Sequence, residues 1–148
     1  MASAMIQTPY EAGRLFGSYE GLRARLCLAT TTSGSPGVNS TTAQWDAAEL
    51  SGNGYIRFEW TLPGGAYNST TERFEAAAQL CTFTASSGGA GLTWNAAYLV
   101  LGSLSGGVTT WNTGVSYFLA HSPSITLPAA ASRGYNVSLF TDGFLVTA

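Results

Sequence analysis

Apolar and polar side chains alternate without interruption from Tyr55 to Leu62, and the turn residues Pro63-Gly64-Gly65 end the run. A period of two places successive side chains on opposite faces of a β-sheet. The pattern therefore predicts a half-buried antiparallel strand. Its expected buried face consists of Ile56, Phe58, Trp60 and Leu62.

Two further segments predict strands of different kinds. Leu22 to Thr30 also alternates, with leucine and alanine on one face and Arg23 and Arg25 on the other. Leu92 to Leu101 is apolar almost throughout, which indicates a central strand covered on both faces.

The rest of the chain reads as short strands between turns. Residues 72–84 fit a helical stripe as well as a strand, and the flanking β pattern favours the strand. Asp142-Gly143 is a strong two-residue hairpin signal. Helix is indicated only weakly, in the N-terminal region and at Thr42–Glu49. The other predicted strands are Val108–Trp111, Val115–Ala120, Ser124–Leu127, Tyr135–Thr141 and Phe144–Thr147.

About eight short strands separated by turn signals predict an all-β fold, an antiparallel sandwich or barrel. We expect one domain at residues 22–148. Residues 1–21, with glycines at positions 13, 17 and 21, are expected to form a short N-terminal arm.

The low charge of the chain limits the classes of partner that it is expected to bind. Only 9% of the 148 residues are charged, and all six basic residues are arginine, which leaves a net charge of −2. A nucleic-acid binder needs a basic face, so we expect no direct nucleic-acid contact. The sequence also contains no apolar run long enough for a membrane helix and no signal-peptide pattern at its start. Cys27 and Cys81 are expected to be buried, and whether they pair stays open.

Candidate chemistry is sparse. His121 is the single histidine, and the following Ser122-Pro123 predicts a solvated loop position. The carboxylate pairs Asp46/Glu49 and Glu72/Glu75 resemble glycosidase acids in type, but their spacing of three favours solvated surface acids. A small carbohydrate-active enzyme is the alternative that these acids leave open. We therefore predict no catalytic residue, no metal and no cofactor.

Aromatic residues are the remaining candidates for contact. Trp60 and Trp94 fall on apolar strand faces and are expected in the core. Large exposed aromatics mark interfaces, and a sugar-stacking platform is the second possibility. The side chains expected in or near turns are Trp45, Tyr67, Trp111 and Tyr117.

Three segments carry a resemblance to a known class. Trp45-Asp46-Ala47-Ala48-Glu49-Leu50 leads through a Gly-rich turn into Tyr55-Ile56-Arg57-Phe58. Phe83-Thr84-Ala85 is followed by a Gly-rich loop, Leu92-Thr93-Trp94 and the strand at 98–102. Ser124-Ile125-Thr126-Leu127-Pro128 precedes Tyr135-Asn136-Val137-Ser138-Leu139. In these patterns the chain resembles small virion proteins of tailed bacteriophages, including those that infect cyanobacteria.

The resemblance implies a β-sandwich, jelly-roll or immunoglobulin-like, that assembles as a homotrimer on the virion. It implies a capsid decoration (cement) protein on the capsid exterior, bound between subunits of the major capsid protein. The alternative is a tail fibre or baseplate component that recognises the host, with glycan binding as one means. We expect the N-terminal arm to contact the capsid through Tyr10, Leu15, Phe16 and Tyr19.

Overall fold

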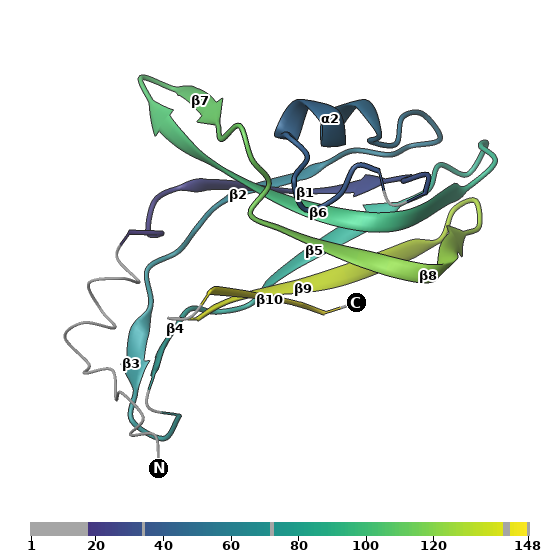
Figure 1. Cartoon of the computed structure of the whole chain (residues 1–148). Helices are drawn as coiled ribbons and strands as arrows, with labels where there is room; N and C mark the ends of the chain where they lie inside the picture. Colours follow the sequence, from purple (N-terminus) through teal and green to yellow (C-terminus); the bar gives the residue numbers. More distant parts are fainter. Residues whose placement is uncertain (1–17, 34, 72, 141–142, 148) are drawn as a thin grey trace, which may run out of the picture.

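The computed structural model describes residues 18–33, 35–71, 73–140 and 143–147. These residues form ten strands and one short helix, arranged as two antiparallel five-stranded sheets (Figure 1). The predicted all-β, sandwich-like fold is thus confirmed. The elements are β1 (Arg23–Ala29), α2 (Thr42–Ala47), β2 (Phe58–Thr61), β3 (Ala66–Asn68), β4 (Arg73–Glu75), β5 (Gln79–Thr84), β6 (Leu92–Ser105), β7 (Val108–Trp111), β8 (Tyr117–Leu127), β9 (Ser132–Phe140) and β10 (Gly143–Thr147).

The first sheet is organised around the long strand β6. β1 pairs with one edge of β6, and β2 pairs with the far side of β1. The other edge of β6 is shared along its length, because β8 pairs with residues 92–99 and β7 with residues 102–105. The β6–β7 hairpin consequently projects beyond the body of the sheet (Figure 1).

The second sheet is organised around β9. β10 pairs with one edge of β9, while β5 and β4 occupy the other edge, and β3 pairs with β4. The antiparallel β9–β10 pair confirms the hairpin predicted near the C-terminus. Residues 141 and 142, which include the predicted turn residue Asp142, lie outside the described residues.

The main core fills the space between the two sheets. It combines alternate residues of β1, β5, β6 and β9 with the end of β2. The chain crosses from one sheet to the other between β2 and β3 and at the β5–β6 and β8–β9 turns. Gly91, at φ +82° just before β6, is needed there, since a Cβ at this position would lie 2.3 Å from the Leu127 carbonyl oxygen. Buried members of this core include Leu26, Leu28, Trp60, Phe83, Trp94, Leu99 and Tyr135.

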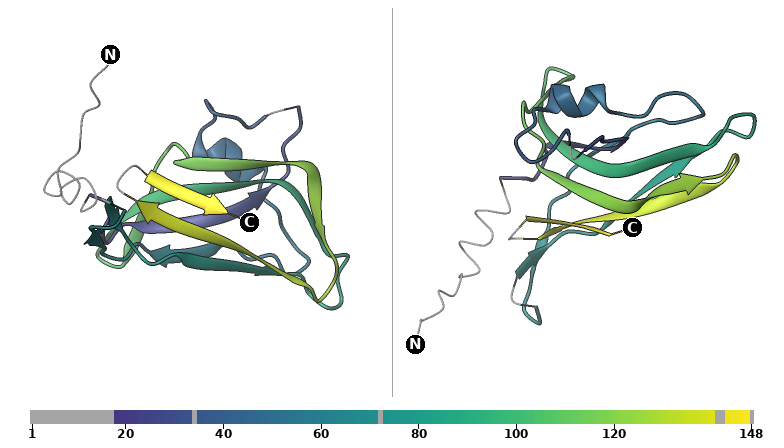
Figure 2. Two further views of the ribbon diagram at one scale, coloured as in Figure 1. Left: turned by 90° about the horizontal axis from the view of Figure 1, so that it is seen from below. Right: turned by 45° about the vertical axis from the view of Figure 1, so that its right-hand side comes forward.

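The opposite face of the first sheet is also buried, because α2 lies across it (Figure 2). Thr41 begins the helix through a capping box with Gln44, in which each side chain accepts a hydrogen bond from the other's backbone N–H. This outer core consists of Cys27, Ala29, Trp45, Ala96, Tyr98 and Val100. β6 is therefore covered on both faces, as its apolar sequence predicts.

The strand prediction for residues 55–62 is wrong at its start. Ladder pairing begins only at Phe58, and Ile56 is 78% exposed instead of buried. The reason lies in side-chain bonds, since Tyr55 and Arg57 both reach Glu49 near the end of α2. These contacts hold residues 55–57 away from the β1 ladder.

Two other predictions need correction or refinement. Ser122-Pro123 does not separate two strands, because both residues lie within the continuous β8. A proline is tolerated there because β8 is paired to β6 on only one side among the described residues. In residues 73–84 the strand interpretation is confirmed by β4 and β5, and the helical alternative is wrong.

Candidate functional site

A partly buried ion pair joins α2 to the first sheet. Arg25 of β1 is only 3% exposed, and its Nη2 donates hydrogen bonds to both carboxylate oxygens of Asp46, at 2.9 and 2.7 Å. The Tyr98 hydroxyl donates to the same carboxylate at 2.8 Å. Asp46 is therefore not the solvated surface acid that its spacing from Glu49 predicts. It accepts bonds from β1 and β6 because α2 turns it toward the sheet.

The Trp111 indole ring packs against the Arg25 guanidinium of this pair. The Arg25 guanidinium carbon lies 4.8 Å from the centre of the indole ring, a cation–π arrangement. The indole also lies against β6, since a Cβ added at Gly102 would come within 2.9 Å of its Cε3 atom. A pocket of about 470 Å³ opens here, lined by Arg25, Thr41, Asp46, Trp111, Asn112 and Thr113 among others. Trp111 is thus partly buried packing and not a free stacking platform.

A second acidic cluster lies at the end of α2. Glu49 accepts hydrogen bonds from the Tyr55 hydroxyl at 2.7 Å and from the Arg57 guanidinium, and its side chain is only 7% exposed. The Tyr55 oxygen in turn accepts from the Leu28 backbone N–H. Burial, the charge of Cys27 and the bond to Glu49 raise the pKa of Tyr55. Glu49 is therefore a buried structural acid and not a surface one.

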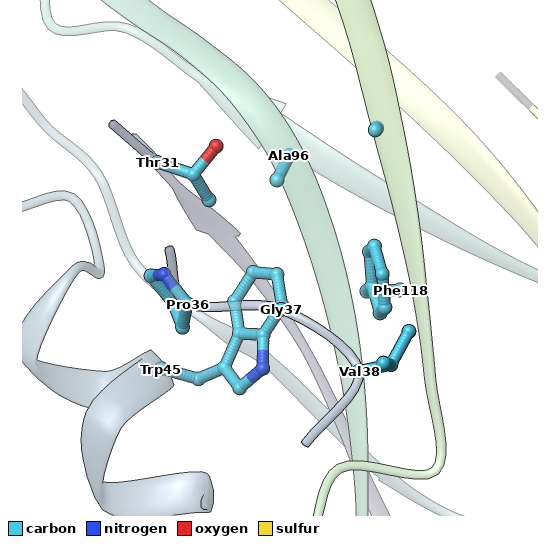
Figure 3. Close-up of a pocket in the computed structure, with 8 residues that line it drawn as sticks. Thr31, Pro36, Gly37, Val38, Trp45, Ala96 and Phe118 are labelled. Atoms are coloured by element: carbon cyan, nitrogen blue, oxygen red, sulfur yellow. The ribbon is translucent and has the colours of Figure 1, made fainter. Parts of the chain in front are cut away.

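An apolar pocket lies on the other side of α2 (Figure 3). Its volume is about 360 Å³, and Trp45 forms its floor between Pro36, Val38 and Phe118. Trp45 is fully buried, although its place near a turn predicts exposure, because α2 presses it onto Tyr98 with ring centres 5.1 Å apart. Its Nε1 is buried without a hydrogen-bond acceptor in the described structure.

His121 is partly buried, and its ring reaches the interior between the sheets. Trp94 Nε1 donates to the Tyr135 hydroxyl at 2.8 Å, and His121 Nε2 lies 2.7 Å from the same oxygen. His121 Nε2 and this oxygen share a hydrogen bond, in which the tautomer of the imidazole decides which atom donates. Burial and the positive charge of Arg133 lower the pKa of His121. The prediction of a solvated loop histidine is wrong, because Ser122-Pro123 continues β8.

The two cysteines are buried and unpaired. Cys27 belongs to the outer core and Cys81 to the core between the sheets, so the first sheet separates them. Burial raises the pKa of each thiol to about 12, with the negative charge of Glu49 adding to the effect at Cys27. Neither thiol is disposed to act as a nucleophile, since that role needs the thiolate.

Three of the carboxylates in the described residues are held by local partners. The Asp46 and Glu49 carboxylates are each neutralised by an arginine, and Glu75 accepts bonds from Asn68 and Thr71. Glu72 lies outside the described residues. No group of three His, Cys, Asp or Glu side chains suited to a metal ion occurs in the described part of the chain.

The remaining contact candidates fall in different environments. Tyr67 on β3 and Tyr117 on β8 are exposed, at 37% and 39%, and lie on different sheets. Tyr19 is partly buried and packs against the core between the sheets, because residues 18–21 turn back onto the end of β2. Tyr10, Leu15 and Phe16 lie outside the described residues.

Sequence reasoning missed the apolar side chains that the fold leaves in solvent. Val38, Ile56, Leu80, Leu104 and Val108 are all more than half exposed. Of these, Leu104 and Val108 belong to β6 and β7, close to the tip of the projecting hairpin (Figure 1). The available signal was the Gly106-Gly107 turn, which separates the two apolar residues and predicts a hairpin tip.

Comparison with protein-family models, with curated proteins and with solved structures finds no significant match. In the described residues no helix is both long and apolar enough to cross a membrane. The function of this chain is therefore inferred from the arrangement of its own residues.

Proposed function

We propose that this chain is a virion structural protein that acts by contact, specifically a capsid decoration protein bound to the exterior of a phage head. Its partners would be further copies of the chain and the major capsid protein. The observation that carries the proposal is the combination of internally paired charges with large apolar side chains left in solvent. Contiguous exposed apolar surface marks sites that bind other proteins, and here Val38 and Phe118 lie together at the edge of one apolar pocket.

The location of the exposed groups supports a bridging role. Leu104 and Val108 lie near the tip of the β6–β7 hairpin, whereas Leu80 lies on β5 of the second sheet. These positions lie on different sheets, so one subunit has apolar contacts available to more than one neighbour. A protein that binds only the assembled lattice adds its contact free energy to the stability of the capsid by linkage.

Immunogold labelling of intact particles tests the proposed location. An antibody against this chain should label heads at high density, and pre-incubation with the purified chain should remove the label. If the label is found only on tails, the chain is a tail fibre or baseplate component instead. Absence of label on particles would contradict a virion role altogether.

A further inference from the structure

β8 has an open edge. In the described part of the chain β8 is paired with β6 alone, in a register that runs from Leu99–Tyr117 to Leu92–Leu127. No described strand lies against its other side. The backbone along such an edge can pair with a strand from another chain.

The first half of this edge lacks the features that normally prevent such pairing. Natural edge strands carry charges, proline or bulges. Residues 117–127 contain no Asp, Glu, Lys or Arg. In the second half of β8, Pro123 has no backbone N–H to donate, and the register shift between Trp94 and Ala96 of β6 lies opposite this part of the strand. Phe118–Ala120 has neither protection, so pairing is expected there.

The outer face of the same segment is incomplete in the single chain. Phe118 and Ala120 both line the apolar pocket, with the Phe118 ring 5.1 Å from that of Trp45 (Figure 3). Phe118 is 38% exposed and Val38, across the pocket, 78% exposed. An added chain beside β8 would cover part of this exposed apolar surface.

We infer that the Phe118–Ala120 edge pairs with the same edge of a second copy, antiparallel, about a two-fold axis at Leu119. Two copies of a charged edge would repel each other, because the same charges would face one another. This edge carries no charged side chain of either sign, so two copies can pair without repulsion. Centring on Leu119 places Phe118 opposite Ala120 of the second copy, so a large side chain meets a small one twice. Such self-complementarity is what a two-fold interface requires.

The consequence is a continuous sheet formed by the first sheets of two copies. Leu119 packs against the core between the sheets, so only Phe118 and Ala120 point to the outer face. The inference concerns self-association alone and does not depend on a capsid location. It favours a two-fold pair over the trimer that the resemblance implies, and a strictly trimeric chain would overturn it.

Sedimentation equilibrium of the full chain at micromolar concentration measures the association. The expected mass is twice the chain mass of 15.4 kDa. Ala120→Glu places a carboxylate against Phe118 of the second copy and should yield a monomer. Ile56→Glu is the matched control, because Ile56 is 78% exposed and lies just before β2, at the far edge of the first sheet from β8, and should leave the dimer intact. A cooperative urea transition in each variant would show that both remain folded, with the higher midpoint expected for the dimeric control because association stabilises the folded chain.

Disulfide trapping tests the register. Opposed residues of antiparallel strands have Cα atoms about 4.5–5.5 Å apart, within disulfide range. A mixture of Phe118→Cys and Ala120→Cys chains should cross-link on mild oxidation, while either variant alone should not. The native thiols are buried and will not contribute. A monomeric wild-type chain, an Ala120→Glu dimer, or cross-linking of a single variant would each overturn the inference.

Discussion

The Arg25–Asp46 pair provides a sharp test of how α2 is held on the first sheet. Asp46→Asn removes the only carboxylate that the described structure places on the Arg25 guanidinium, while the shape and the Tyr98 contact are kept. The Arg25 side chain is 4% exposed, so its charge would stay in a poorly solvated site. Leaving one member of a buried pair without its partner costs about 3–5 kcal/mol. Because the Asp46 side chain is 33% exposed, we expect a loss of stability at the lower end of that range, about 3 kcal/mol.

The reverse change should cost less. Arg25→Met removes the cation but leaves Asp46, whose side chain is 33% exposed and still accepts from Tyr98. Losing the hydrogen bonds to a charged group costs about 1.5–3 kcal/mol. In the double variant neither charge remains, so we expect it to be about 2 kcal/mol more stable than the sum of the single effects predicts.

Urea unfolding followed by tryptophan fluorescence measures all three variants. The neighbouring Arg23–Glu59 pair supplies the control, since its charges are 3.6 Å apart and both side chains are substantially exposed. Glu59→Gln should cost less than about 1 kcal/mol. A comparably small cost for Asp46→Asn, or strictly additive effects in the double variant, would refute the argument from burial.

Three further results follow from the structure. The pKa of His121 in the folded chain lies below its ordinary value of 6.5, so as the pH falls the unfolded chain takes up this proton before the folded chain does. The free energy of unfolding should therefore fall as the pH drops below about 6.5. His121→Gln should flatten this dependence in urea titrations from pH 8 to 5. Tyr135→Phe leaves the Trp94 N–H without its acceptor and should cost about 1–3 kcal/mol by the same urea assay, whereas an unchanged midpoint would exclude a structural role for this bond. Cys27 and Cys81 should react with a thiol reagent at pH 8 only after denaturation, and rapid labelling of the folded chain would contradict their burial.

The N-terminal arm is tested by a deletion placed according to the structure. Tyr19 packs against the core, so residues 1–17 should be removed and residues 18–21 kept. We expect a folded chain with an unchanged urea midpoint that no longer coats heads. Full decoration by the truncated chain would show that the arm is not the capsid contact.

The sequence predicts the sheets well because each strand leaves a local signal. The apolar run of β6 reflects the burial of both of its faces. The alternation in β1 reports the strand period but not the burial, since Arg25 is buried as fully as Leu26 and Leu28. Even the double covering of β6 follows from its composition. The core positions of Trp60 and Trp94 are confirmed for the same reason.

The sites around α2 were not predictable in this way. The spacing of Asp46 and Glu49 is the same on an exposed helical turn as on one laid across a sheet. What buries them is contact with Arg25, Tyr98, Tyr55 and Arg57, residues 6 to 52 positions away in the sequence. Trp45 is buried by the same packing. Long-range contacts of this kind leave no periodic trace in the sequence.

Binding of the purified chain to heads that lack it tests the central claim most directly. Heads and chain are sedimented together across a range of chain concentrations, with unassembled major capsid protein as the control. We predict that the chain binds saturably to assembled heads and does not bind to the free major capsid protein. No co-sedimentation with heads at any concentration would contradict it.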